Sequence, residues 1–259
     1  MDIKRLFRSF TLIINYKTYL LTIISVLSSY LCFTWGLTAK FPDMLVGVAI
    51  VFPVVFSIGS AYNRRETALQ RWADFRGHAI ALYYATRDWP SDQNNDLAAR
   101  CRTLTTDMVQ RTKELLTSKK DAWDKKEEEF YSLFSKLSHL TMEMRKYGVQ
   151  SGEISRVSQY LSKMVIAFDN LKIIYQYRTP ITLRTYSKVF IYVFPIIYGP
   201  YFASTFHEFS ASLEYVMPVL YSFILVSLDN IQDHLEDPFD QVGEDDINID
   251  ANETIRLLV

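Results

Sequence analysis

Four stretches of the chain carry no charged residue, and they set its overall pattern: 18–39, 44–62, 189–206 and 215–228. The first two contain 22 and 19 residues, enough to cross a bilayer core of about 30 Å as helices that rise roughly 1.5 Å per residue. The third has 18 residues and includes Pro195 and Pro200, and the fourth has 14. Residues 209–213 extend the fourth stretch if Glu214 is accommodated. The pattern predicts four transmembrane helices.

Two other interpretations of these stretches are weaker. A secretory signal peptide is short and ends in a small-residue cleavage site, whereas the first stretch is long and lacks that ending. Helices in the core of a soluble protein do not need about 20 apolar residues in a row. An integral membrane protein embedded in the lipid bilayer is therefore the prediction.

The distribution of Lys and Arg predicts the orientation. Of 28 basic residues, 4 precede the first stretch, 22 lie in 63–188, and Lys40 alone lies in the connection between the first two stretches. Cytoplasmic segments retain Lys and Arg, so both termini and the middle region are expected in the cytosol, with the plasma (inner) membrane as the location. The predicted segments are a cytosolic N-terminal helix (1–17), two transmembrane helices (18–62), a cytosolic domain (63–188), two further transmembrane helices (189–228) and an acidic cytosolic tail (229–259).

The middle region is predicted to be helical, which makes the fold class all-α. Pro90 and the polar residues 91–95 separate two helices, 148–152 interrupts the chain again, and Pro180 ends a helix over 154–177. Between 121 and 147, apolar residues recur at a spacing of mostly three or four, which favours a helix with one packed face. They are Trp123, Phe130, Phe134, Leu137 and Leu140.

Composition argues against several classes of protein. With 28 basic and 29 acidic residues the net charge is -1, which gives no indication of nucleic-acid binding. Cys32 and Cys101 are too few for a disulfide framework or a zinc site. The sequence contains neither a glycine-rich phosphate loop nor a Gly-x-Ser-x-Gly elbow, and its histidines share no spacing: His78, His139, His207 and His234. An enzyme is disfavoured, and no cofactor is required.

The second stretch carries a regular apolar pattern. Val48, Phe52 and Phe56 recur every four residues and so share one helix face. The flanking positions are also apolar, so this spacing alone favours ordinary helix packing. Arg64 and Arg65 follow the stretch, either as charges at the inner mouth of a pathway or as plain anchors at the membrane boundary.

Three segments together resemble the bestrophin family of ion channels. The first is 52–72, FPVVFSIGSAYNRRETALQRW, which is similar to the pore-helix signature of the family. The second is 178–186, RTPITLRTY, similar to the entry to the third transmembrane helix. The third is EDPF at 236–239 with DDINID at 245–250, which resembles the acidic tail of the family. The resemblance covers nearly the whole chain, and the tail ending is closer to the bacterial branch.

The resemblance implies a homopentamer in which helix 44–62 of each chain lines a central pore for small inorganic ions. Val48, Phe52 and Phe56 match the hydrophobic rings of the family's neck, and rings of this kind gate by dewetting. Ile154 matches the cytosolic aperture, and Arg64 supplies charge at the inner mouth. The expected ions are chloride or other anions. A cation-selective pore and a non-conducting sensor or scaffold that binds a partner through its helical domain are the alternatives.

The tail departs from the family pattern, because Asp240 follows Pro238 and Phe239 where the family has glycine. In animal members the acidic run forms a calcium clasp of oxygen ligands, for which the corresponding candidates are Asp245, Asp246 and Asn248. The tail also carries opposite charge to the middle region: from Asp229 onward there are ten acids and one base. We expect it to be a strap on the basic domain, anchored by burial of three apolar residues: Ile247, Ile249 and Leu257.

Overall fold

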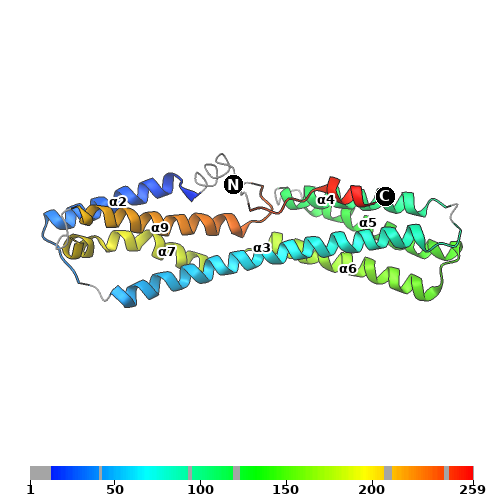
Figure 1. Ribbon diagram of the computed structural model, residues 1–259, viewed down its shortest axis with the longest axis horizontal. Helices are drawn as coiled ribbons and strands as arrows, with labels where there is room; N and C mark the ends of the chain where they lie inside the picture. Colours follow the sequence, from blue (N-terminus) through cyan, green and yellow to red (C-terminus); the bar gives the residue numbers. More distant parts are fainter. Residues whose placement is uncertain are drawn as a thin grey trace. The chain divides into compact units, whose positions relative to one another are not determined.

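The computed structural model describes residues 13–40, 43–92, 95–118, 123–206, 212–241 and 245–258, and the regular structure in these ranges is helical (Figure 1). The chain forms two compact units. Among the described residues, unit 1 comprises those up to Arg64, Arg178–Asp237 and Asp245, and unit 2 comprises the remainder. The all-helical class predicted from the sequence is found throughout these ranges. The N-terminal helix expected over 1–17 lies mostly outside them.

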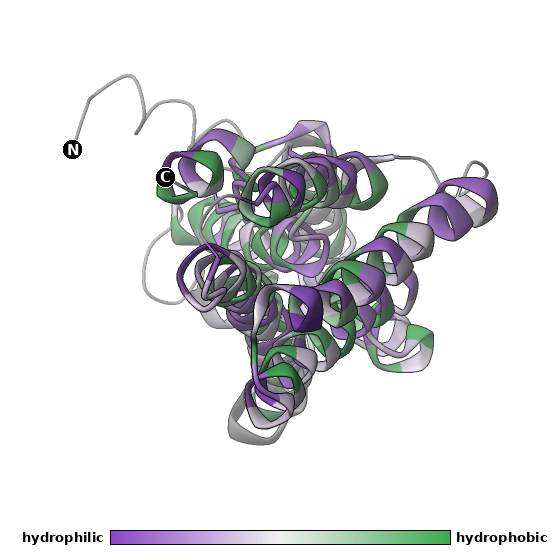
Figure 2. Cartoon of the chain, turned by 90° about the vertical axis from the view of Figure 1, so that its right-hand side faces the viewer, coloured by the Kyte–Doolittle hydropathy of each residue, from purple (hydrophilic) through white to green (hydrophobic). Residues whose placement is uncertain are grey.

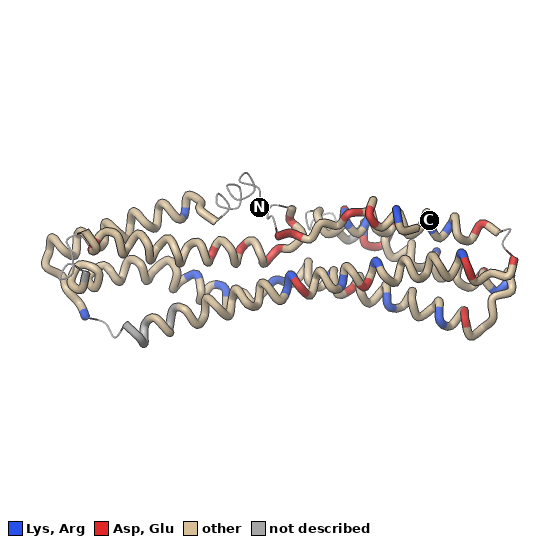
Figure 3. The backbone as a smooth tube through the Cα atoms, viewed as in Figure 1, with Lys and Arg blue, Asp and Glu red and all other residues tan. Residues whose placement is uncertain are grey.

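Unit 1 contains the helices that carry the four charge-free stretches. They are α2 (Tyr16–Thr34), the first part of α3 (Asp43–Asp88), α7 (Ile181–Ile197), the short α8 (Gly199–Tyr201), the π-helix η3 (Phe202–Phe206) and α9 (Leu213–Glu236). Charged residues in this unit are concentrated where α9 ends and α7 begins, and the rest of these helices is almost free of charged residues (Figure 3).

Small and hydroxyl-bearing residues allow the helices of unit 1 to approach closely. The Ser25 hydroxyl of α2 donates to the Pro195 carbonyl at 2.8 Å, and the Ser28 hydroxyl donates to the Ile196 carbonyl at 2.8 Å. A Cβ placed on Gly199 would lie 2.4 Å from Ser28 Oγ, so this crossing requires glycine. Close backbone approach with interhelical hydrogen bonds is the usual way that helices associate in lipid.

Among the described helices, α2 alone meets both criteria for crossing a membrane: sufficient length and sufficient mean hydropathy. The other three predicted spans lie in α3, in α7 with α8 and η3, and in α9. The helix α7 has only 17 residues before Tyr198, and α9 ends in a charged turn. The prediction of four transmembrane helices in two pairs therefore stays a prediction.

Unit 2 is a helical bundle with a large aromatic core. It contains the second part of α3, α4 (Leu97–Thr117), α5 (Trp123–Glu143), η2 (Met144–Tyr147), α6 (Ser151–Gln176) and α10 (Ala251–Leu257). The breaks predicted at Pro90 and after Tyr147 fall between these elements. Phe130 of α5 stacks on Phe168 of α6 with ring centroids 4.0 Å apart. Hydrophobic and hydrophilic residues alternate around the helices, as the hydropathy colouring shows (Figure 2).

The end of the chain belongs to the core of unit 2. Phe239, Ile247, Ile249 and Leu258 are buried in it, α10 packs on α4, and the Ile247 amide donates to the Pro238 carbonyl at 2.8 Å. The predicted anchoring by Ile247 and Ile249 is confirmed, but that by Leu257 is wrong. The Leu257 side chain is 43% exposed, because its turn of α10 directs Leu258 inward instead.

Candidate functional site

The neck residues predicted on α3 lie on a face that unit 1 leaves open. Val48, Phe52 and Phe56 are 56%, 61% and 56% exposed, and the Phe52 and Phe56 rings contact each other edge-on at 4.6 Å. The opposite face is packed, since Val54 and Ser57 are buried. The chain alone thus keeps an aliphatic and aromatic stripe uncovered, although burial of such side chains is worth about 1.5–3 kcal/mol each.

Arg64, predicted at the inner mouth, is held by the last turn of α9. Its Nε donates to the Glu236 carbonyl at 3.0 Å, one of the carbonyls that a helix end leaves without a partner inside the helix. Partial burial lowers the pKa of the Arg64 guanidinium, and the carboxylates of Glu236 and Asp237 oppose that shift. A cation at a helix C-terminus is also favoured by the helix dipole. Arg64 is therefore fixed within unit 1.

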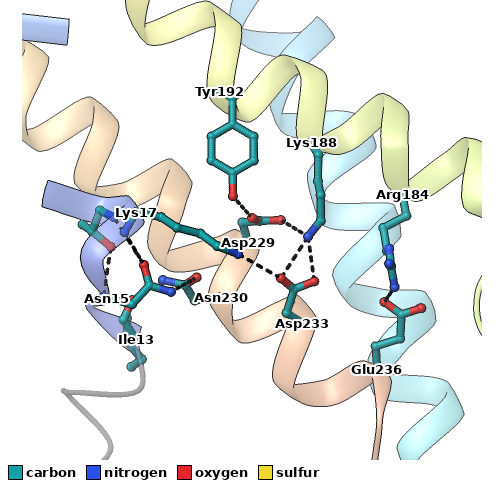
Figure 4. Close-up of polar contacts among 11 residues, drawn as sticks. Ile13, Asn15, Lys17, Arg184, Lys188, Tyr192, Asp229, Asn230, Asp233 and Glu236 are labelled. Carbon is teal, nitrogen blue, oxygen red and sulfur yellow. Dashed lines mark hydrogen bonds and ion pairs between the residues drawn. The ribbon is translucent and has the colours of Figure 1, made fainter. Parts of the chain in front are cut away.

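A group of polar side chains joins α2, α7 and α9, and we call it the polar cluster: Lys17, Lys188, Tyr192, Asp229, Asn230 and Asp233 (Figure 4). Lys188 Nζ donates to both carboxylate oxygens of Asp233 at 2.9 Å. The Tyr192 hydroxyl donates to Asp229 Oδ2 at 2.6 Å. Asp229 is fully buried, and Lys188 Nζ lies 3.7 Å from its Oδ1. The cluster pairs opposite charges that would be costly to bury singly.

A second group, the Glu236 cluster, lies one turn further along α9: Arg64, Arg178, Thr179, Arg184, Glu236 and Asp237. The Glu236 side chain is 2% exposed. It accepts from Arg184 Nη1 at 2.7 Å and from the Thr179 hydroxyl at 2.8 Å. Arg178 Nη2 donates to Asp237 at 2.7 Å.

Sequence reasoning missed both clusters, because it assigned every residue from Asp229 onward to an acidic tail. In the structure α9 continues through Glu236, eight residues into the predicted tail. One signal was present in the sequence. Asp229 and Asp233 on one segment, and Arg184 and Lys188 on another, each repeat at a spacing of four, which places like charges on one helix face.

The remaining predicted positions lie in or beside unit 2. Ile154 is buried in the core of unit 2 at the first turn of α6, so in the single chain its side chain is packed. Its role at a cytosolic aperture stays a prediction.

The calcium candidates lie in the segment 245–248. Asp245 and Asn248 are exposed, on either side of the buried Ile247. Among the described residues, no group of three His, Cys, Asp or Glu side chains is placed to hold a metal ion. Calcium prefers six to eight oxygen ligands, so these three side chains alone would not complete its coordination. A calcium site at Asp245, Asp246 and Asn248 has no structural support and stays a prediction.

Comparison with known proteins gives a result at the level of structure. No family model matches the sequence, and no curated protein matches it. The crystal structure of a bacterial bestrophin homologue from Klebsiella pneumoniae superposes with a TM-score of 0.78 at 17% identity, over 94% of this chain and 96% of that chain. A point variant of that homologue gives a TM-score of 0.80 at 17% identity, over 93% and 97% of the two chains.

The chain has the bestrophin fold. A further structure, described as a variant of a membrane protein, supports the same conclusion with a TM-score of 0.80 at 17% identity, over 94% of this chain and 98% of that chain. The bestrophin resemblance of the three sequence segments is therefore confirmed at the level of the fold. At this identity the likeness extends to the backbone, whereas the roles of individual side chains have to be argued from this chain.

Proposed function

We propose that this protein is the subunit of a bestrophin-type channel in a membrane, passing small inorganic ions passively, with chloride and other anions preferred. The observation that carries the proposal is the uncovered stripe on α3, in a chain with the bestrophin fold over nearly its full length. An apolar stripe of this size needs a partner surface or a special environment. A central pore shared by five copies gives it one.

The proposed neck follows from the geometry of the stripe. Five copies of α3 around one axis turn Val48, Phe52 and Phe56 into three stacked apolar rings, one helical turn apart. Such rings offer ions no replacement for their hydration shell, so a narrow neck empties of water and closes, and a wider one conducts. The contact between Phe52 and Phe56 supports concerted movement of two adjacent rings.

The preference for anions rests on charge. The region 63–188 has 22 bases against 15 acids, but the ten acids from Asp229 onward offset this excess. The positive charge that favours anions is therefore local: the Glu236 cluster has three guanidinium groups against two carboxylates, and positive charge raises the local concentration of anions. A cation-selective pore of the same fold is the alternative, since an apolar neck does not by itself choose the sign of the ion. A non-conducting scaffold would leave the stripe on α3 without a role.

Recording from purified protein in planar bilayers tests the proposal. We expect discrete currents whose reversal potential in asymmetric potassium chloride moves toward the chloride equilibrium potential. Movement toward the potassium potential would assign the cation alternative. Absence of current from protein that retains its helical circular dichroism would contradict the channel.

A further inference from the structure

The chain passes between the two units at a few points, and the first three of them meet in one cluster of unit 1. These passages follow Arg64, Tyr177 and Asp237. The residues of unit 1 that border them are Arg64, Arg178 and Asp237, and all three belong to the Glu236 cluster. The helix α3, the segment that leads into α7 and the end of α9 are thus tied together where each leaves the unit.

Glu236 is the residue on which these ties converge. Its carboxylate takes one hydrogen bond from Thr179 and one from Arg184, and its main-chain carbonyl takes the bond from Arg64 Nε. The carboxylate is buried, and hydrogen bonds to charged groups in such surroundings are among the stronger ones. Glu236 therefore holds the last turn of α9 in the orientation that presents its carbonyl to Arg64.

We propose that Glu236 is a positioning residue for ion selection: it fixes Arg64 at the inner end of the α3 segment 44–62 and neutralises part of the positive charge there. This inference rests on the proposed channel function and names a determinant of its selectivity. The cluster contains three guanidinium groups and two carboxylates, so one positive charge per chain remains beside the pore helix. Five such charges attract anions to the inner mouth.

Glu236→Gln tests the proposal, because glutamine has the same size and keeps an acceptor for Thr179 but removes one negative charge. We expect the anion-to-cation permeability ratio to rise by about twofold or more, since an unscreened charge near the pathway changes local ion concentrations. Arg64→Gln removes a positive charge from the same place and is expected to lower the ratio. The readout is the reversal potential of reconstituted channels in asymmetric salt.

Two further variants separate positioning from general effects. Asp233→Asn, one turn earlier on α9, removes an equal charge from a residue paired with Lys188 rather than with the Glu236 cluster, and we expect a smaller shift. The double variant Glu236→Gln with Arg184→Gln restores the charge balance of the cluster and should return the ratio toward that of the unchanged protein. If the single Glu236 variant fails to fold, the expected fall of the ratio in Arg64→Gln is the test.

Each outcome has a distinct meaning. An unchanged ratio in Glu236→Gln, or a shift equalled by Asp233→Asn, overturns the role of Glu236 while leaving conduction intact. An unchanged ratio in Arg64→Gln shows that Arg64 does not contribute to ion selection. That result overturns the inference as well. Absence of current from the unchanged protein contradicts the proposed function itself.

Discussion

At the scale of single residues, the two exposed phenylalanines of the α3 stripe test the proposed neck most directly. Phe52 and Phe56 are exposed and in mutual contact, and replacement by alanine removes bulk without disturbing the packed face of the helix. In the proposed neck, Phe52→Ala with Phe56→Ala should widen and wet the constriction. We expect higher open probability or conductance in single-channel recordings.

Val51→Ala is the matched control for the neck, because Val51 is equally apolar and exposed but lines a groove with Tyr221 and Ile224 of α9. Its currents should resemble those of the unchanged protein. Currents unaltered in the double phenylalanine variant would make the two rings packing residues instead.

Cys101 provides a pH test of unit 2. Burial raises the pKa of its thiol, and hydrogen bonds with Thr86 and Thr105 oppose the shift. The folded protein thus keeps a proton that the unfolded chain loses above about pH 8.5. The stabilising contribution is present below that pH and is lost as pH rises toward the folded pKa, by up to about 1.4 kcal/mol per pH unit.

Urea unfolding between pH 7 and 10 measures this contribution. The free energy of unfolding should fall more steeply with pH in the unchanged protein than in Cys101→Ala. Apart from this difference in slope, the substitution should change the free energy of unfolding by a constant amount. Cys32→Ala, which alters a thiol of unit 1 that is only partly buried, should keep the steep slope. Parallel slopes in the unchanged protein and Cys101→Ala would count against a buried, protonated thiol.

At the scale of elements, the C-terminal segment behaves as part of unit 2. Ile247, Ile249 and Leu258 fill the core, Arg76 pairs with Glu253 at 2.7 Å, and the Tyr84 hydroxyl donates to the Leu257 carbonyl at 3.0 Å. The apolar contacts carry most of the attachment, since exposed ion pairs contribute about 1 kcal/mol or less.

Ile249→Ala should therefore lower the free energy of unfolding by about 2–4 kcal/mol, from lost burial and the cavity left behind. Leu257→Ala changes an exposed side chain on the neighbouring helix and should stay within about 0.5 kcal/mol. Denaturant unfolding of the purified protein compares the two. Equal effects would show that the segment is held by its polar contacts.

At the scale of the whole molecule, the uncovered α3 stripe leads to a prediction about assembly. The channel that we propose has five chains around the pore, with the stripes of all five facing the axis. We expect native mass spectrometry in a mild detergent to show a pentamer. A monomer or dimer that keeps its helical circular dichroism would contradict the proposed channel.

The helices themselves follow from local patterns. Apolar spacing and the breaks at Pro90 and Pro180 predicted the helical elements of unit 2, because these signals act on neighbouring residues and need no knowledge of distant partners. The buried Ile247 and Ile249 were predicted for a similar reason, since alternating isoleucines in an acidic segment have few ways to avoid water. The order of three short motifs then indicated the bestrophin fold.

Tertiary structure determined which charged residues are buried and which partners they pair with. Asp229 and Glu236 belong to the predicted acidic tail, yet both are buried in unit 1. Tyr192, Lys188, Arg184 and Thr179 approach them from segments 37 to 57 positions away. The sequence reveals which side chains are charged but not which of them meet. For the same reason it did not distinguish Leu257 from Leu258, whose positions depend on how α10 turns against α4. Pairing across the fold lowers the cost of burying charge, and that pairing exists only once the helices have packed.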